Sequence, residues 1–425
     1  MKKVMLKTTL SLAVAMASSQ LFVSGFALNE QSVSGMGTGF AGRSSSADDA
    51  STVFGNPAGM ARLEGQQITG GVAAIDASTD ISDVSGRSRG SNKGDMVPFT
   101  AVPFGFYTNK LNDQWAVGFG VYAPFGLVTD YESGFQGRGF GSKSEVKVIT
   151  FQPTVSYAFN DRVSVGFGPT INRIAGTLES DLTLNARAPD TNIKIKGDDT
   201  ALGFNIGVLV QATDTTRVGL TYHSKVSYKL DGHTEVTAPA ATAAALRSNR
   251  YDASLKIDTP ESYDLSVTQD LSDAWKLYAG ATWTRWSRLK DITVKNDGVS
   301  GATGGALAPA LVGTIKEDQN WHDTWAYAVG TSYQLTKQVV LRTGLTFDQS
   351  PTNNTDRSPR IPTGDRTIFS LGLGYEVMPN MTIDLAYSYL KEEDVKVSRS
   401  NQLASYNAKY ENSANGFGLG MTYKF

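Results

Sequence analysis

Side chains that could perform catalysis or bind a metal are few in this chain of 425 residues. There is no Cys, so thiol nucleophiles, thiolate metal sites and disulfides are excluded. The three histidines, His223, His233 and His322, supply little general-base or metal-binding chemistry, and spacing gives none of them an obvious Ser partner. The sequence therefore favours a protein that is not an enzyme and that uses neither a metal nor another cofactor.

Two glycine-rich stretches match short functional motifs, but neither lies in the surroundings that its motif requires. Residues 37–42 (GTGFAG) fit the dinucleotide pattern G-x-G-x-x-G, yet no apolar strand precedes them and no helix follows. Residues 86–90 (GRSRG) have the spacing of a nucleophile elbow but lie in a Gly/Ser-rich stretch. We expect neither nucleotide binding nor serine hydrolase chemistry there.

The charge balance argues against a nucleic-acid partner. The chain has 39 basic and 41 acidic side chains, a net charge of −2, and no run of basic residues. Duplex binding depends on clustered Lys and Arg that neutralise phosphates. We therefore expect no nucleic acid among the partners.

The N-terminus has the features of a secretory signal peptide. Lys2, Lys3 and Lys7 precede a short apolar stretch, residues 9–17, which is too short to span a bilayer. The best small-x-small cleavage site is residues 25–27 (GFA), and cleavage near residue 23 or 24 also fits. We assign residues 1–24 to the signal peptide, with cleavage anywhere from 23 to 27. A buried N-terminal helix is the alternative.

From residue 66 onward, apolar side chains alternate with small or polar ones in segments typical of β-strands. We count fourteen such segments, among them residues 66–78, 163–182, 200–213 and 339–348. No later stretch approaches 18 consecutive apolar residues, so no transmembrane helix is expected. The remaining choice is between a soluble secreted β protein and a membrane barrel.

The connections between these segments favour the barrel. Short turns alternate strictly with long, polar or Gly-rich loops, which is typical of barrels with short periplasmic turns and long outer loops. The last segment alternates apolar residues with glycines and ends in Phe425, which resembles the signal that outer-membrane barrels present to their assembly machinery. We therefore predict an all-β fold, a 14-stranded antiparallel transmembrane β-barrel over residues 66–425, in the Gram-negative outer membrane.

Residues 28–65 do not alternate and are mostly small and polar. From composition alone they could form a linker on the periplasmic side or fold into the barrel as a plug. Composition favours the linker, and the sequence motifs of this stretch favour the plug.

Several motifs resemble the long-chain fatty acid transport protein family of Gram-negative outer membranes, which includes aromatic hydrocarbon channels. Near the N-terminus these are residues 25–30 (GFALNE), 34–37 (SGMG), 47–50 (ADDA) and 56–58 (NPA). Later matches are residues 125–131 (FGLVTDY), 286–287 (WS), 342–344 (RTG), 347–351 (FDQSP), Arg357, 361–362 (IP) and 365–366 (DR). The resemblance spans nearly the whole chain, and the motifs are specific when taken together.

The resemblance implies a monomeric barrel whose lumen is closed by an N-terminal hatch, residues 25–65. It also implies that the third strand is kinked around Pro124 and Gly126 to open a lateral window, and that Asn56, Pro57 and Ala58 of the hatch touch this kink. Pro cannot donate to a ladder and Gly weakens one, so the local residues are compatible with the kink. The alternative is that the strand simply ends there, at the membrane edge.

The resemblance also implies the ligand and its site. A fatty acid needs an apolar tunnel for its tail and a cationic or donor group for its carboxylate. We expect Phe26 and Leu28 in the tunnel and Arg173 and His322 near the carboxylate. His322 stands where the family suggests a Lys, and neutral His binds a carboxylate more weakly. If cleavage follows Ala27, Phe26 is lost and its assignment fails.

The sequence thus predicts passive uptake of long-chain fatty acids, or similar hydrophobic molecules, by lateral diffusion through the wall of a barrel embedded in outer-membrane lipid and lipopolysaccharide. The alternatives are a channel for neutral aromatic hydrocarbons, which His322 would favour, and a general aqueous porin, which the hatch argues against. An Arg173 that points into an apolar pocket would favour fatty acids.

Overall fold

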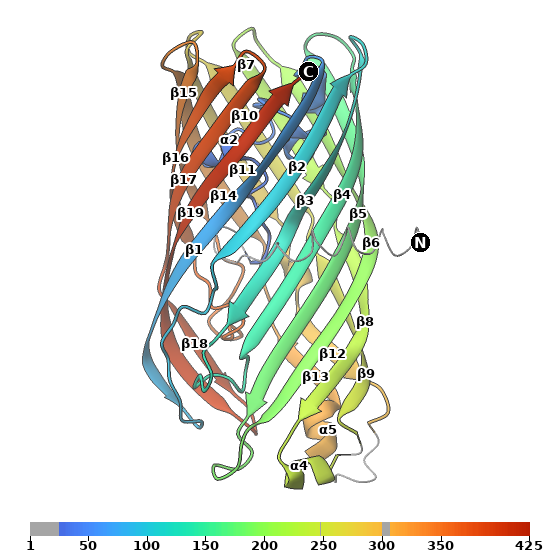
Figure 1. Ribbon diagram of the computed structural model, residues 1–425, viewed down its shortest axis with the longest axis vertical. Helices are drawn as coiled ribbons and strands as arrows, with labels where there is room; N and C mark the ends of the chain where they lie inside the picture. The colour runs from blue at the N-terminus through green and yellow to red at the C-terminus, as the bar shows by residue number, and fades with distance from the viewer. Residues whose placement is uncertain (1–24, 247, 300–306) are drawn as a thin grey trace.

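The computed structural model describes residues 25–246, 248–299 and 307–425, and its strands form a closed antiparallel β-barrel (Figure 1). The expected signal peptide, residues 1–24, lies outside the described residues. β1 (Gln66–Gly86) pairs with β2 (Thr100–Lys110) on one side and with β19 (Ser405–Lys424) on the other. The sheet therefore closes on itself. In the described ranges, no helix is long and apolar enough to cross a membrane.

The barrel has fourteen strand lines, as the alternation predicted. The unbroken ones besides β1, β2 and β19 are β3 (Trp115–Asp130), β4 (Lys143–Ala158), β5 (Val163–Leu182), β6 (Thr191–Gln211), β15 (Val339–Asp348) and β16 (Arg366–Met378). The interrupted ones are β7 (Thr216–His223) with β8 (Val226–Thr237), β9 (Arg250–Thr259) with β10 (Ser262–Asp270), β11 (Trp275–Thr284) with β12 (Asp291–Asn296), β13 (Thr314–Asp318) with β14 (Thr324–Gln334), and β17 (Met381–Glu392) with β18 (Val395–Ser400).

Some strand bounds match the prediction and others extend past it. β5 and β15 cover the predicted residues 163–182 and 339–348. β6 begins at Thr191 instead of residue 200, and β1 continues to Gly86 instead of ending at residue 78. These extensions pair with β5 and β19 but carry polar side chains on their outward face, so the apolar alternation stops before the strand does.

Large apolar side chains cover the outside of the wall. Exposed examples are Phe151, Phe167, Leu202, Leu265, Val329, Phe369 and Leu419. The inward positions of the same strands carry small or polar residues such as Thr154, Ser266 and Ser370, which are buried. An apolar outside and a polar inside are the pattern of outer-membrane barrels.

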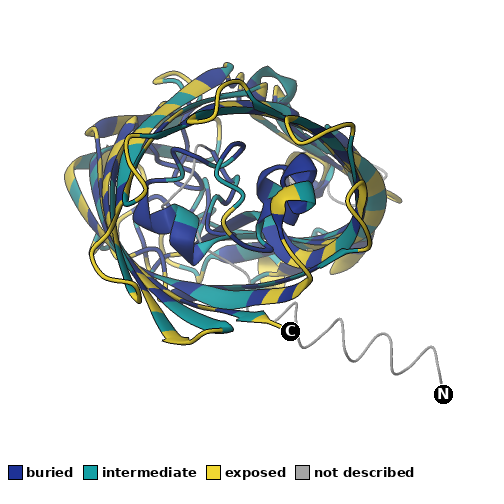
Figure 2. Cartoon of the chain, turned by 90° about the horizontal axis from the view of Figure 1, so that it is seen from above, coloured by how far each residue is buried: buried dark blue, intermediate teal, exposed yellow. Residues whose placement is uncertain are grey.

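The N-terminal segment, residues 25–65, lies inside the barrel and is not an external linker. It contains three short helical turns, α2 (Val33–Gly37), α3 (Thr52–Gly55) and η1 (Pro57–Arg62), and Figure 2 shows buried helical turns within the ring of strands. Inward-facing glycines let the segment approach the wall closely. A Cβ added at Gly219 would lie 1.7 Å from the Ser44 carbonyl oxygen, and one at Gly344 would lie 2.2 Å from Thr38.

Buried hydrogen bonds hold this segment against the wall. The Ser44 amide donates to Ser266 Oγ (2.9 Å), and Ser44 Oγ donates to the Asp264 carboxylate (2.5 Å). The Arg217 guanidinium on β7 donates to the carbonyl oxygens of Ser45 and Ser46. The N-terminal segment and the barrel wall both lose water where they meet, so each of these polar groups needs a hydrogen-bond partner.

β3 contains an irregularity near Pro124, where the resemblance implied a kink. Its register with β4 shifts between Tyr122 and Phe125, and the strand continues beyond this bulge to Asp130, so it does not simply end there. The ladder between β2 and β3 extends only as far as the pair Gly105↔Val121. Beyond it, the sheet is open between these two strands.

Long connections gather at one end of the barrel and short turns at the other (Figure 1). The long-loop end carries α4 (Ala240–Ala244) and α5 (Leu307–Val312), whereas the C-terminus lies at the opposite end. In barrels of the outer membrane the long loops face outward.

Candidate ligand-binding site

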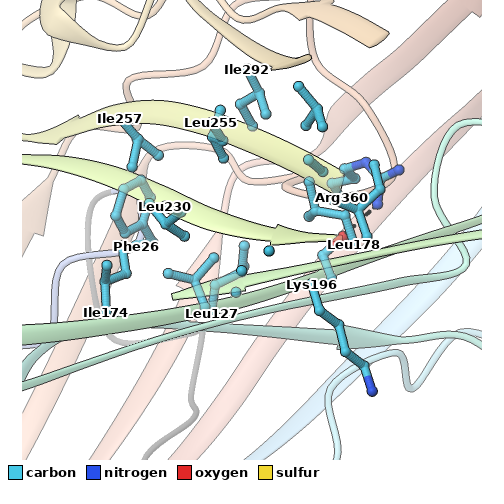
Figure 3. Close-up of a pocket in the computed structure, with 18 of the residues that line it drawn as sticks. Phe26, Leu127, Ile174, Leu178, Lys196, Leu230, Leu255, Ile257, Ile292 and Arg360 are labelled. Atoms are coloured by element: carbon cyan, nitrogen blue, oxygen red, sulfur yellow. Dashed lines mark hydrogen bonds between the residues drawn. The ribbon is translucent and has the colours of Figure 1, made fainter. Parts of the chain in front are cut away.

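An apolar cavity lies inside the barrel wall, with about 830 Å³ of empty space that includes a part open to solvent (Figure 3). Its apolar lining includes Phe26, Leu127, Ile174, Leu178, Leu230, Leu255, Ile257 and Ile292. These residues come from the N-terminal segment, from β3 and β5, and from β8, β9 and β12. Barrel lumens are usually polar, so a set of inward-facing Leu and Ile side chains marks a functional deviation. We call this cavity the Phe26 pocket.

Phe26 closes one end of the pocket with a cluster of aromatic rings. Its ring centroid lies 4.9 Å from that of Trp286, 5.7 Å from Phe125 and 5.9 Å from Trp321. Only 3% of Phe26 is exposed. Gly25 before it has φ +68, and a Cβ there would lie 2.8 Å from the rings of both Trp residues. Glycine therefore suits both the backbone turn and the crowding that put Phe26 in place.

Arg360 lies at the opposite end of the lining from Phe26 (Figure 3). Its guanidinium is engaged by the protein: Nε donates to Glu317 (3.1 Å), and the two terminal nitrogens donate to Ser144 Oγ (2.9 Å) and Ser180 Oγ (2.7 Å). Lys196 also lines the pocket, but its side chain points away from the apolar residues (Figure 3). The pocket therefore suits an apolar chain better than a charged group.

The prediction that Arg173 meets a carboxylate in the lumen is wrong. Arg173 lies on the outer face of β5, where it pairs with Asp198 (2.7 Å) and donates to Thr200 (3.2 Å). Its neighbour Ile174, which is 1% exposed, points inward and lines the pocket. Successive residues of a strand face opposite sides of the wall. A shift of one residue in matching this chain to the family therefore moves the expected side chain from the lumen to the exterior.

His322 does not line the pocket either. It precedes β14, its side chain is exposed, and its backbone N–H donates to the Pro351 carbonyl oxygen (3.1 Å). The adjacent Trp321 is the residue that points inward and joins the aromatic cluster around Phe26. The prediction was displaced by one residue, as it was at Arg173.

Leu28 lies beside the Phe26 pocket and not in it. Its side chain is buried and lines a second cavity of about 660 Å³, together with Pro124 and Phe125 of the bulge. The Leu28 N–H donates to the Pro124 carbonyl oxygen (2.7 Å), and the Gly126 N–H donates to the Phe26 carbonyl oxygen (2.8 Å). Residues 26–28 thus supply β3 with backbone partners where β2 does not.

Asn56, Pro57 and Ala58 contact the wall, but not at the bulge as the resemblance implied. Asn56 Nδ2 donates to the carbonyl oxygens of Ser44 (2.7 Å) and Val208 (3.0 Å), and its Oδ1 accepts from the Ala58 N–H. A Cβ at Gly166 of β5 would lie 2.3 Å from the Pro57 carbonyl carbon. These three residues therefore pack on β5 and β6.

The side chain that does reach the bulge is Gln31, whose Nε2 donates to the Ala123 carbonyl oxygen (2.6 Å). Sequence reasoning missed this residue, and it missed most of the apolar lining. The available signal was that residues 253–257 carry apolar side chains in a region that is otherwise polar. Only the fold shows that they converge with β5 and β8.

Comparison with known proteins agrees with the barrel and with the sequence motifs. A family model described as "Outer membrane protein transport protein (OMPP1/FadL/TodX)" matches residues 14–425. The "Long-chain fatty acid transport protein" of Escherichia coli O6:H1 is 29% identical over 461 residues, covering 100% of this chain and 99% of that protein.

Two solved structures share the fold. The crystal structure of a Pseudomonas aeruginosa FadL homologue has a TM-score of 0.85 and 27% identity, covering 95% of this chain and 100% of that one. The Ralstonia pickettii toluene transporter TbuX has a TM-score of 0.65 and 19% identity over 88% of this chain and 94% of that one. At that identity, the second comparison supports the fold alone.

Proposed function

This chain belongs to the outer membrane protein transport protein family (OMPP1/FadL/TodX), and from this membership we propose that it admits long-chain fatty acids, or hydrophobic molecules like them, across the outer membrane. One observation carries the proposal: an apolar pocket, lined by Leu, Ile and Phe side chains, lies in the lumen of a barrel of a class whose lumen is usually polar. Ligand pockets for hydrophobic molecules are lined mainly by apolar side chains. The pocket thus has the lining expected for an alkyl chain.

We further propose that residues 25–65 act as a hatch and that the bulge in β3 is the exit. A molecule in the Phe26 pocket is separated from the bulge by the rings of Phe26 and Phe125. Residues 26–28 hold the bulge through the two backbone hydrogen bonds at Pro124 and Gly126. If these bonds open and Phe26 turns aside, the molecule passes between β2 and β3 into the lipid. Such movement is passive and follows the concentration of the ligand.

Neutral hydrocarbons are the second candidate ligand class. The observation in their favour is that Arg360, the cation at the end of the pocket, is engaged by Glu317 and other protein oxygens, while Arg173 faces outward. A neutral molecule needs no ionic partner there. The relative TbuX is named a toluene transporter, although that likeness supports the fold alone.

The other partners are proposed from the same premise. Outer-membrane lipid and lipopolysaccharide would surround the exposed apolar band, and the barrel assembly machinery would engage the C-terminal strand through Phe425, which is 70% exposed. We propose that one chain forms the transporter, because a single chain closes the barrel.

Equilibrium binding to the folded, detergent-purified barrel tests the proposed function. We expect saturable binding of a labelled long-chain fatty acid, weakened about tenfold by Phe26→Ala, since loss of a buried ring costs at least 1–2 kcal/mol of apolar contact. The matched control is Phe119→Ala, which removes an outward-facing ring that is 43% exposed. Absence of saturable binding would contradict the proposal. Stronger competition by a neutral aromatic hydrocarbon than by unlabelled fatty acid would favour the second ligand class.

A further inference from the structure

Arg43, in the N-terminal segment, differs from the other arginines inside the barrel. Its guanidinium carbon lies 5.3 Å from the centre of the Phe40 ring, and within the described part of the chain it forms no hydrogen bond or ion pair. Its Nε is buried and has no hydrogen-bond partner. The residue as a whole is half-buried. A buried donor of a cation that lacks a protein acceptor is costly, so it marks a place where an anion can bind.

The comparison with neighbouring arginines shows how unusual this is. Arg342 pairs with Asp384 at 2.6 Å, and Arg366 pairs with Glu392 at 2.8 Å. Arg217 donates to two backbone carbonyl oxygens of the N-terminal segment. Each of these three guanidinium groups has at least one acceptor supplied by the protein, although two nitrogens of Arg366 are buried without a hydrogen-bond partner. The Arg43 guanidinium has no acceptor in the described ranges.

Arg43 lies where internal cavities meet. Together with Asn29 it lines three of them, with about 760, 510 and 660 Å³ of empty space that includes parts open to solvent. The cavity of about 660 Å³ is also lined by Pro124 and Phe125 of the β3 bulge. It therefore adjoins the bulge, next to residues 27 and 28 of the N-terminal segment.

The same cavity has an unsatisfied polar atom on the wall side as well. The amide donors of Asn172 and Asn205 are engaged by Thr170 and Gln152, whereas His223 Nε2 is buried without a hydrogen-bond partner. Together with Arg43 Nε, this atom indicates that the cavity can receive a polar group. The Phe26 pocket, by contrast, has apolar walls and an arginine whose donors are already engaged.

We propose that Arg43 binds the carboxylate of the substrate in transit, at a second site between the Phe26 pocket and the β3 bulge. The inference rests on the proposed uptake of fatty acids. The tail occupies the Phe26 pocket first, and the head group is then received by Arg43 once Phe26 and Phe125 part. Without this cation the carboxylate would have to cross a buried space with no ionic partner, which raises the barrier for the anion but not for a neutral molecule.

A structural role is the competing explanation. Glu30 lines the cavity of about 760 Å³ with Arg43, and both of its carboxylate oxygens are buried without a hydrogen-bond partner. No ion pair joins Glu30 to Arg43 in the structure, but water could bridge the two and so hold the N-terminal segment in place. In that case, loss of Arg43 would loosen the segment and affect all ligands alike.

The test compares a charged and a neutral ligand of the same chain length. Uptake of a labelled long-chain fatty acid and of the corresponding fatty alcohol is measured in cells that depend on this protein. We expect Arg43→Gln to slow fatty acid uptake about tenfold, the loss expected for one charge-assisted hydrogen bond, and to leave alcohol uptake unchanged. Arg43→Lys should retain most of the activity, because it keeps the charge. Arg173→Gln, which removes an outward-facing arginine, should change neither rate.

Two further measurements separate the outcomes. Equilibrium binding of the fatty acid to purified Arg43→Gln protein should equal that of the wild type, which shows that the fold and the Phe26 pocket are intact. Ion conductance in planar bilayers should also be unchanged. Equal fatty acid uptake in wild type and variant, equal loss of acid and alcohol uptake, or a rise in ion conductance would each overturn the proposal. If the wild type admits the alcohol but not the acid, the proposed fatty acid function itself fails.

Discussion

At the scale of single residues, Arg173 and Ile174 show how much depends on the face of a strand. They are adjacent in β5, yet Arg173 pairs with Asp198 outside and Ile174 lines the pocket inside. We expect Arg173→Ala to leave fatty acid binding unchanged and to lower the free energy of unfolding by less than about 1 kcal/mol, because exposed ion pairs contribute little. Ile174→Ala should weaken binding by about tenfold. Isothermal titration of both variants tests this, and weaker binding by Arg173→Ala alone would contradict it.

Asn56 is a single residue whose side chain helps to hold the N-terminal segment against the barrel wall. Its side chain forms three hydrogen bonds, to Ser44, Val208 and Ala58. Asn56→Ala should weaken docking of the segment by roughly 2–3 kcal/mol, since the carbonyl oxygens of Ser44 and Val208 lose a buried donor. We expect more frequent opening events in planar-bilayer recordings of the variant. Recordings indistinguishable from the wild type would show that these bonds do not hold the segment.

The family resemblance singled out Phe26, which lines the candidate pocket, but neither Arg43 nor the orientation of Arg173 could be predicted from the sequence. Phe26 comes from a motif at the start of the segment, where no strand register intervenes. Arg173 and His322 lie in or next to strands, and each was displaced by one position relative to the inward-facing residue, Ile174 or Trp321. Alternation fixes which residues share a face, but not which face is inside once both carry apolar side chains.

At the scale of elements, the wall strands are shaped to receive the N-terminal segment. Gly219 and Gly344 face inward where backbone atoms of the segment approach most closely. We expect Gly219→Ala to displace the segment, because its Cβ would lie 1.7 Å from the Ser44 carbonyl oxygen, and to raise ion conductance through the lumen. The matched control is Gly105→Ala on β2, where a Cβ meets nothing within 4 Å. Equal conductance of the two variants would contradict the prediction.

The elements were more predictable than the site. The strand count follows from alternation, which is a local signal. The bulge near Pro124 was implied by the family resemblance, and the local Pro and Gly residues were only compatible with it. The early start of β6 at Thr191 could not be predicted, because that part of the strand lies beyond the apolar band and carries Lys194, Lys196 and Asp198. Its strand character comes from long-range pairing with β5, which periodicity does not report.

At the scale of the whole molecule, the barrel combines two interiors separated by a thin partition. One is the apolar Phe26 pocket, and the other is a space of mixed polar and apolar lining beside the N-terminal segment. The partition consists largely of Phe26, Ala27 and Phe125, and the same residues hold the bulge in β3. A movement of residues 25–28 would therefore join the two spaces and open the wall in one step, while the remainder of the segment stays docked.

Engineered disulfides can test whether this local movement is required, because the chain contains no Cys of its own. Ala27 and Phe125 form an isolated antiparallel bridge whose flanking hydrogen bonds make them a non-hydrogen-bonded pair. The Cα atoms of such pairs lie about 4.5 Å apart, within the range of disulfides. We expect the double variant Ala27→Cys/Phe125→Cys to lose fatty acid uptake when oxidised and to recover it on reduction. Because both states carry the same substitutions, the difference between them reports the disulfide alone.

A second lock, placed deeper in the segment, provides the matched control. A Cβ at Gly420 of β19 would lie 3.2 Å from Val33 Cβ, slightly closer than in an ideal disulfide. If only residues 25–28 move, oxidised Val33→Cys/Gly420→Cys should keep its uptake, because it fixes a part that remains docked throughout. Loss of uptake in both oxidised variants would instead mean that the whole segment leaves the wall, and unchanged uptake in both would mean that the bulge in β3 is not the exit.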